Sequence, residues 1–284
     1  MRKTYLGCLG RTTAELLPRS RKIRIALTGL LLGWVSASEG QAGVLYGVGR
    51  ETGQPPAIYR IDKTTAQATR IASLEGQPDT AALAVDAAGV AILSDVFQKG
   101  SIDGVLLGRV DLETGAVHPL LNPDSTGAPG ISGLAFGADG SFFGSSRGDA
   151  FPKLYRLERN SSLSSLVAAW PGKLQICGLA AASDGRLFAA SATDLYTFNG
   201  ATAALTLIGP HGLPFSQPKF VEQFGLTYDE EDRVLYATDS WFSNPNGVLY
   251  RVNPATGAAT AIGATGVEIS ALASVRGVTE IPAL

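Results

Sequence analysis

Three observations in the sequence predict an all-β fold, a β-propeller of five four-stranded blades. A four-strand unit recurs five times at intervals of roughly 45–51 residues, a spacing typical of propeller blades. The composition, with 34 glycines and 45% hydrophobic residues, suits short strands joined by many turns. The repeat begins with the second strand of a unit and ends with a first strand, Ile269 to Val275. That last, innermost strand would complete the N-terminal blade and close the ring without open sheet edges.

Each unit contains four strand patterns in a fixed order. The first recognisable pattern carries Tyr, Phe or a bulky aliphatic residue, as in Val44–Gly47, Val90–Leu93, Ser141–Gly144, Arg186–Ala189 and Val234–Ala237. A run with alternating apolar and polar residues follows, which indicates a half-buried strand, at Ile58–Asp62, Leu106–Val110, Leu154–Leu157, Leu195–Phe198 and Leu249–Val252.

The two remaining strands of each unit are separated from these by turns. A Gly-containing turn such as Asn253–Gly257 leads to the outer strand, at Ala68–Ile71, Ala116–His118, Ser164–Val167, Leu205–Ile208 and Ala259–Ile262. The most apolar strand then follows, with small residues that suit the crowded centre of a ring, at Ala82–Val85, Gly133–Phe136, Gly178–Ala181, Gly225–Tyr228 and Ala271–Ser274. The alternative architectures are an open stack of hairpins and a two-sheet sandwich.

The units resemble those of bacterial exported propellers of the NHL and YVTN repeat type. The resemblance is carried by Gly225-Leu226 through Tyr236-Ala237 and by Leu249-Tyr250-Arg251-Val252, and it covers nearly all of residues 43–277. It implies the propeller fold. It implies no particular activity, because such rings include lyases, lactonases, scaffolds and ligand-binding modules.

The N-terminus predicts export. A basic stretch precedes the apolar run Ile25–Val35, and small residues follow it, so that either Val35-Ser36-Ala37 or Gly40-Gln41-Ala42 suits cleavage. The run is short for a bilayer span, although an uncleaved membrane anchor is the alternative. We therefore expect a signal peptide at 1–42, a propeller domain at 43–277 and a C-terminal tail at 278–284. The mature chain would have no membrane span and would lie in the periplasm, at the cell surface or outside the cell.

The charge of the chain disfavours a nucleic-acid-binding protein, and its cysteine content disfavours a protein stabilised by intrachain disulfides. Residues 1–42 carry seven of the 23 basic residues and two of the 25 acidic ones, so the remainder has 16 basic and 23 acidic residues and a net charge of −7. An acidic body disfavours nucleic-acid binding, which needs a basic surface. Cys177 alone remains after residue 42, so stability must come from the core rather than from an intrachain disulfide. Its place before an apolar strand predicts a buried thiol.

Long loops on one side of the ring predict a binding face. Because strands alternate in direction, the irregular loops gather on the face opposite the tight turns, where binding residues are usually found. There, Asp95 and Asp239 occupy equivalent positions, and Trp241 and Phe242 follow Asp239. The candidate binding residues of this long-loop face are Asp95, Asp239, Trp241, Phe242, His211 and Arg147. Aromatic and acidic groups of this kind suit a carbohydrate or a protein or peptide partner.

Carboxylates before the innermost strands predict a cation site at the mouth of the channel. Asp79, Gln175, Glu222 and Glu268 stand three residues before the Gly/Ala-Leu pair of their strands, and would line the channel mouth on the long-loop face. Oxygen ligands of this kind suit Ca²⁺. The alternative interpretation is that these groups are ordinary solvated residues.

No catalytic set is recognisable. Two histidines, His118 and His211, occur without a nucleophile elbow, and Cys/His spacing typical of zinc is absent from the sequence. Two functions stay open: an exported non-enzymatic module that binds a ligand or a protein through the long-loop face, and a lactonase-like, divalent-metal-dependent hydrolase with carboxylates at the channel mouth.

Overall fold

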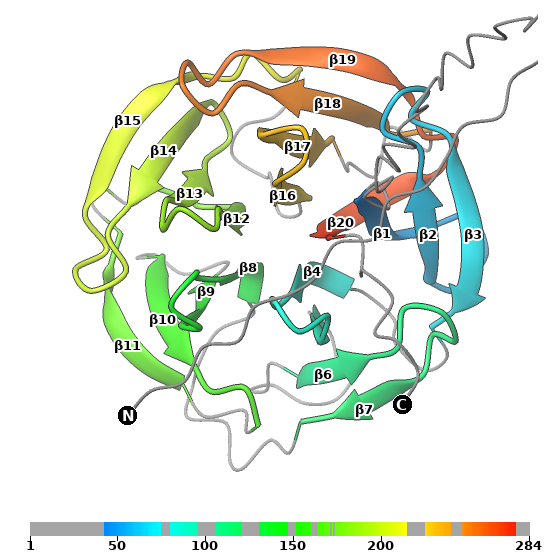
Figure 1. The fold of residues 1–284 in the computed structure, drawn as a ribbon, viewed down its shortest axis with the longest axis horizontal. Helices are drawn as coiled ribbons and strands as arrows, with labels where there is room; N and C mark the ends of the chain where they lie inside the picture. Colours follow the sequence, from blue (N-terminus) through cyan, green and yellow to red (C-terminus); the bar gives the residue numbers. More distant parts are fainter. Residues whose placement is uncertain are drawn as a thin grey trace, which may run out of the picture. The chain divides into compact units, whose positions relative to one another are not determined.

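The chain folds into five antiparallel four-stranded sheets that surround a central axis (Figure 1). The computed structural model describes residues 43–74, 80–95, 106–120, 131–146, 152–160, 164–170, 172, 174–214, 225–239 and 246–276. All of these fall within one compact unit, Glu39–Leu284, and none of them is α-helical. No helix in these ranges is long and apolar enough to cross a membrane. The predicted signal peptide and C-terminal tail lie outside the described residues.

Each sheet is one blade, and its strands follow one another from the centre outwards. Blade 1 contains β20 (Glu268–Val275), β1 (Val44–Arg50), β2 (Ala57–Ile61) and β3 (Ala68–Ser73). Blade 2 contains β4 (Thr80–Val85), β5 (Ala91–Asp95), β6 (Leu106–Val110) and β7 (Val117–Pro119). Blade 3 contains β8 (Ile131–Phe136), β9 (Phe142–Ser146), β10 (Lys153–Leu157) and β11 (Ser164–Ala169). Blade 4 contains β12 (Gly178–Ala181), β13 (Leu187–Ala190), β14 (Asp194–Phe198) and β15 (Leu205–Pro210). Blade 5 contains β16 (Leu226–Asp229), β17 (Val234–Thr238), β18 (Val248–Val252) and β19 (Ala259–Ala264).

The ring closes through the C-terminal strand, as the phase of the repeat predicts. β20 pairs antiparallel with β1 from Val44↔Val275 to Arg50↔Glu268, with one register shift between Val48 and Gly49. The last described strand is therefore the innermost strand of the first blade, and the prediction of a closed five-bladed propeller is confirmed.

The hydrophobic core lies between the blades rather than inside any one of them. A blade is a single sheet with two apolar faces, so each face must be covered by a neighbouring blade. Five buried clusters result, one at each contact between neighbouring blades; we call such a contact a seam and name it by its two blades. Cluster members at the 4/5 seam, for example, include Phe188 and Leu195 from blade 4 and Leu235 and Tyr250 from blade 5. Cys177 is buried in the same cluster, as expected.

Buried hydroxyl groups connect the blades around the centre. Four of them donate across a seam to the main chain at the start of the next innermost strand: Ser94 Oγ to Ile131 O (3.0 Å), Ser132 Oγ to Ile176 O (3.1 Å), Thr238 Oγ1 to Ile269 O (2.9 Å) and Ser270 Oγ to Thr80 O (2.8 Å). These carbonyls lie at or near the start of the innermost strands. Each hydroxyl therefore adds a hydrogen bond that joins one blade to the next.

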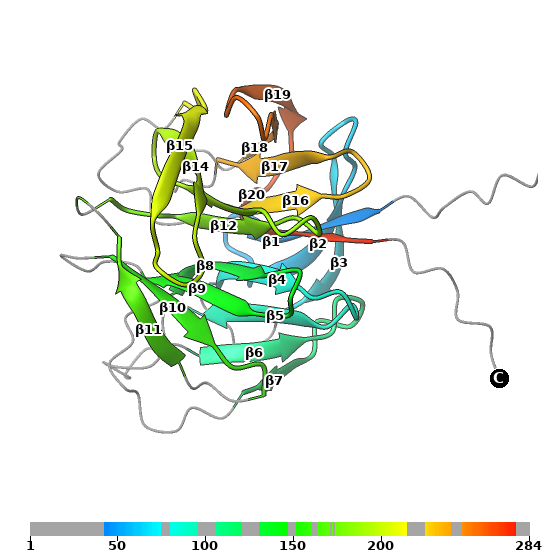
Figure 2. The ribbon, with the colours of Figure 1, turned by 60° about the vertical axis from the view of Figure 1, so that its left-hand side comes forward.

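Tight turns define one face of the ring, which we call the turn face. It carries the turns from each innermost strand to the next strand outwards, together with the start of β1 and the end of β20, on the right in Figure 2. It also carries the outer turns, which begin at Asp62, Asp111, Asn199 and Asn253. In these turns the side-chain oxygen of the Asp or Asn accepts main-chain N–H groups two or three residues on. The opposite face is the long-loop face of the sequence analysis, and most of its loops lie outside the described residues.

Candidate functional site at the turn face

Asp239, predicted to bind a ligand on the long-loop face, organises the end of its own loop. The residue follows β17 and is 8% exposed. Its Oδ1 accepts the N–H of Val248 at 2.6 Å, and its Oδ2 accepts the hydroxyl of Tyr250 at 3.2 Å. Burial and the neighbouring Asp239 carboxylate raise the pKa of Tyr250, which holds the phenol as a donor. These contacts give Asp239 a structural role in joining β17 to β18.

His211, also predicted for the long-loop face, is buried beside blade 4. Its imidazole Nε2 lies 3.0 Å from the carbonyl oxygen of Ser191, and its Nδ1 accepts the N–H of Leu213 at 3.1 Å. Its own carbonyl accepts the N–H of Ala259 in blade 5. Burial lowers the pKa of His211, although the Ser191 carbonyl and Asp194 oppose the shift. His211 directly follows β15, which extends to Pro210, and Leu213 is part of the 4/5 core.

The remaining predicted residues are described in part. The backbone of Asp95 ends β5 opposite Leu106, Gln175 is exposed ahead of β12, and Glu268 opens β20 opposite Arg50. Trp241, Phe242, Arg147, Asp79 and Glu222 lie outside the described residues. Within the described ranges, no group of three or more His, Cys, Asp or Glu side chains is arranged to hold a metal ion. The cation site at the long-loop mouth therefore stays a prediction.

A cavity of about 520 Å³ opens at the other mouth of the channel, on the turn face. We call it the turn-face cavity. All five blades line it, through the ends of their innermost strands and, in blades 2 to 5, through the turns that follow. Its volume falls within the range of small-molecule sites, roughly 300–1,000 Å³. No pattern in the sequence predicts a site here.

The floor of the turn-face cavity is apolar and nearly closed. Leu83, Leu134, Leu179 and Leu226, one from each of four innermost strands, line both the cavity and the narrow space beneath it. That space has a volume of about 10 Å³. A single water molecule needs roughly 10–15 Å³ on the same measure, so this space is too small to hold an organic molecule. A ligand of the turn-face cavity would therefore lie above the leucines.

An ion pair across the 2/3 seam forms one side of the rim. Asp86 follows β4 and is almost completely buried, and its Oδ1 accepts the N–H groups of Ala88 (2.8 Å) and Val90 (2.9 Å). Its Oδ2 accepts Arg159 Nη1 from blade 3 at 2.6 Å. The Arg159 side chain is 41% exposed, and its guanidinium carbon lies 4.9 Å from the centre of the Phe136 ring.

A second rim cluster joins blades 4, 5 and 1. Glu230, in the turn after β16, accepts the main-chain N–H of Ser183 through Oε1 and the Ser183 hydroxyl through Oε2 at 2.8 Å. Arg276, directly after β20, places Nη2 3.2 Å from Glu230 Oε1, and its side chain is 60% exposed. Each rim carboxylate therefore has an arginine partner and further donors from the turns.

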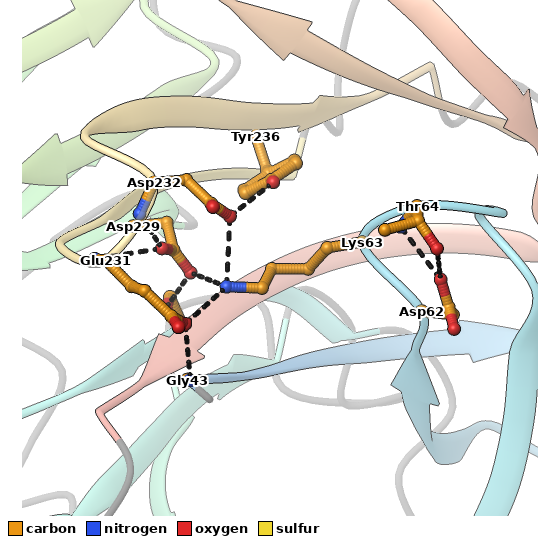
Figure 3. A network of polar contacts seen from close by, with 9 residues as sticks. Gly43, Asp62, Lys63, Thr64, Asp229, Glu231, Asp232 and Tyr236 are labelled. Atoms are coloured by element: carbon orange, nitrogen blue, oxygen red, sulfur yellow. Dashed lines mark hydrogen bonds and ion pairs between the residues drawn. The ribbon is translucent and has the colours of Figure 1, made fainter. Parts of the chain in front are cut away.

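Next to this cluster, Lys63 of blade 1 forms ion pairs with three carboxylates of blade 5 (Figure 3). Its Nζ lies 3.1 Å from Asp229 Oδ2 and 3.0 Å from both Glu231 Oε2 and Asp232 Oδ2, and its side chain is 15% exposed. Burial alone would lower the pKa of Lys63, but hydrogen bonds to the three carboxylates outweigh burial and raise it. Lys63 therefore stays charged, and it offsets part of the negative charge gathered at the 5/1 seam.

No protein-family model matches the chain, and no curated protein matches it. Similar solved structures are the nidogen/laminin complex, TolB from Acinetobacter baumannii and a virginiamycin B lyase from Staphylococcus aureus. The first is 13% identical, with coverage of 83% of this chain and 98% of that chain and a TM-score of 0.51. TolB is 14% identical (82% and 66% covered, TM-score 0.44), and the lyase is 13% identical (79% and 71% covered, TM-score 0.41). The likeness to the first supports the propeller fold alone, and the NHL and YVTN repeat type remains a resemblance.

Proposed function

We propose that this chain is an exported, non-catalytic binding module that holds a small molecule in the turn-face cavity. The single observation that carries the proposal is the cavity of about 520 Å³, which narrows to an apolar floor and has a polar rim. Its walls are innermost strands, each paired within its blade and packed against neighbouring blades, so the cavity is preformed and little order is lost on binding.

A rim substitution tests this proposal. Ala138 lines the cavity and is exposed, so Ala138→Trp adds an indole at the mouth without entering the core. Ala201→Trp is the matched control, because Ala201 is an exposed residue of an outer turn on the same face and does not line the cavity. We expect ligand-observed NMR with a panel of small organic acids, alcohols and sugars to detect binding to the wild type and to Ala201→Trp, and to lose it with Ala138→Trp. Equal binding by all three proteins, or by none of them, would contradict the proposal.

The long-loop face stays the predicted place for capture of a carbohydrate, protein or peptide partner. His211 and Leu213 are buried, so a deletion that tests this face has to leave both residues in place. A deletion of residues 215–223 leaves both in place. We expect partner capture to fall and the melting temperature to stay near that of the wild type; a large loss of stability would contradict a binding role for this segment.

The hydrolase alternative has a separate readout. If carboxylates at the long-loop mouth hold Ca²⁺, the cation will raise the melting temperature of the wild type, and Glu268→Gln will remove that rise. Gln175 lies in the equivalent position of blade 4, so glutamine is an accepted side chain there. No response of the wild type to Ca²⁺ would end the hydrolase interpretation and would leave the binding module unaffected.

A further inference from the structure

We infer that the turn-face cavity takes a small organic anion, a carboxylate or a phosphate or sulfate ester carried on an apolar body. This inference rests on the proposed function and adds the chemical class of the ligand. It follows from which polar groups of the rim already have partners, and from the apolar floor beneath them.

The two carboxylates of the rim have little capacity left for a ligand. Asp86 accepts two main-chain N–H groups and Arg159, and its side chain is 3% exposed. Glu230 accepts the N–H and the hydroxyl of Ser183 and also pairs with Arg276. A ligand cation would have to displace these donors, some of which are fixed parts of the turns. The rim is therefore unsuited to an ammonium group.

The two arginines do have spare capacity. A guanidinium carries five N–H donors, and the described ion pairs engage Arg159 through Nη1 and Arg276 through Nη2. Their side chains are 41% and 60% exposed at the mouth of the cavity. Carboxylates and phosphates match the flat fork of a guanidinium with two parallel hydrogen bonds, which are stronger than hydrogen bonds between neutral groups.

The carboxylate partners also hold the arginines in place. Arg159 is fixed between Asp86 and the face of Phe136, and Arg276 is fixed on Glu230. The two stand at different seams, 2/3 and 5/1, so the mouth offers an anion site on either side of the axis. Between them the residues that line the cavity are mostly Ala, Leu and Val, which suit an alkyl or aryl body.

Binding of a fluorescent anion tests the inference. The probe is 1-anilinonaphthalene-8-sulfonate, and its uncharged counterpart is N-phenyl-1-naphthylamine. We expect Arg159→Met and Arg276→Met each to weaken the sulfonate by about tenfold, the loss of one charge-assisted contact, and to leave the neutral probe unchanged. Arg70→Met, which changes an exposed arginine of the outer strand β3, should bind both probes as the wild type does. Added salt should weaken the sulfonate alone.

Competition then identifies the head group. Octanoate and octyl phosphate should displace the sulfonate, and the stronger competitor distinguishes a carboxylate ligand from a phosphate ester; octanol should displace it poorly. Because Arg159→Met also unpairs Asp86, its melting temperature is measured, and Arg159→Lys, which keeps the charge, should recover part of the binding. Arg276 is more exposed, so its variant gives a second reading that does not depend on the 2/3 seam.

Three results would overturn the inference. Equal affinity for the two probes together with unchanged binding by both arginine variants would mean that the cavity selects apolar bodies only, and the proposed function would survive. Sulfonate binding that Ala138→Trp leaves intact would place the probe elsewhere on the molecule. If neither probe binds and the NMR panel is also silent, the proposed function fails together with this inference.

Discussion

His211, a predicted binding residue, makes hydrogen bonds that stabilise the fold. Both ring nitrogens are engaged, since Nε2–H donates to the Ser191 carbonyl while Nδ1 accepts from the N–H of Leu213. This arrangement fixes the neutral tautomer, because a proton on Nδ1 would face the N–H of Leu213. Geometry and burial therefore act in the same direction, and both disfavour the imidazolium.

We predict that His211 makes the protein less stable in mild acid. Its pKa in the folded protein is lowered from the ordinary 6.5, so the unfolded chain takes up the proton first as the pH falls. The free energy of unfolding should decrease from about pH 6.5 downwards, until the folded protein is also protonated. His211→Gln should remove this decrease, since an amide can donate to Ser191 and accept from Leu213 without titrating. Urea unfolding at about pH 7.5 and about pH 5 measures the effect.

His118→Gln is the control for this prediction. His118 lies on the outer strand β7 and is exposed. The variant should keep the full pH dependence of the wild type. The same decrease in wild type and in His211→Gln would show that another group is responsible.

Among the structural elements, the turns of the turn face follow a pairing rule across three seams. In each case the outer turn of one blade meets the C-terminal end of the innermost strand of the preceding blade. Lys63, Leu112 and Arg159 occupy the same place in the outer turns of blades 1, 2 and 3, two residues after Ile61, Val110 and Leu157. Each lies at a seam with the preceding blade, where Asp229, Val275 and Asp86 occupy the same place, three residues after the leucine of the innermost strand.

The partners at each of these three seams match in chemistry. Lys63 pairs with Asp229 at the 5/1 seam, and Arg159 pairs with Asp86 at the 2/3 seam. At the 1/2 seam both positions are apolar, and Leu112 and Val275 pack against the same cluster. A mismatch would leave a buried carboxylate without a cation or would bring a charge against an apolar partner, either of which is costly. The matched pairs therefore stabilise the contacts between neighbouring blades.

We predict that the 1/2 seam will accept the charged pair of the other two seams. Leu112→Lys and Val275→Asp should each lower the free energy of unfolding by about 1–2 kcal/mol, because each places an unpaired charge at a partly apolar contact. The double variant should be more stable than the sum of the two losses predicts, by about 1 kcal/mol of coupling energy. Urea unfolding of the four proteins in a double-mutant cycle measures this coupling.

A distant acid provides the control for the cycle. Thr260 is exposed on the outer strand β19 of blade 5. Leu112→Lys combined with Thr260→Asp should therefore be additive. Additivity in the Leu112/Val275 cycle as well would mean that the two positions do not interact, and the pairing rule would be rejected.

Sequence repeats predicted the strands and their order because each strand depends on local alternation and on small residues near the axis. The pairs that connect the blades were not predictable in this way. Lys63 and Asp229 are 166 residues apart, and neither stands out until the ring brings blades 1 and 5 together. The turn-face cavity was missed for the same reason, because its rim and floor are assembled from six separate segments. Asp239 is a candidate binding residue because it follows a strand. That position does not reveal that the N–H of Val248 and the hydroxyl of Tyr250 already donate hydrogen bonds to its carboxylate oxygens.

For the molecule as a whole, β20 determines whether the ring exists. It pairs with β1 and contributes Ile269, Ala271, Leu272 and Ala273, all nearly inaccessible to solvent. Burial of one large aliphatic side chain is worth about 1.5–3 kcal/mol, so Ile269 and Leu272 alone contribute a large part of the 5–15 kcal/mol that stabilises a typical domain. Ser270 adds a hydrogen bond from β20 to Thr80 of blade 2. The closing strand therefore supports the blades on both of its sides.

We predict that a chain ending at Val267, without β20, will not unfold cooperatively, because blade 1 loses its innermost strand and both of its seams lose their cover. A chain ending at Gly277, which lacks only the predicted tail 278–284, should keep the wild-type midpoint in urea and the wild-type melting temperature. Adding a synthetic peptide of residues 268–276 to the shorter chain should restore a cooperative transition, since it supplies the missing strand in trans. A peptide in which Ile269 and Leu272 are replaced by serine should not, because it keeps the main-chain partners of β1 but loses the two large side chains of the seams. If the chain ending at Val267 unfolds at the wild-type midpoint without any peptide, ring closure by β20 does not hold the molecule together.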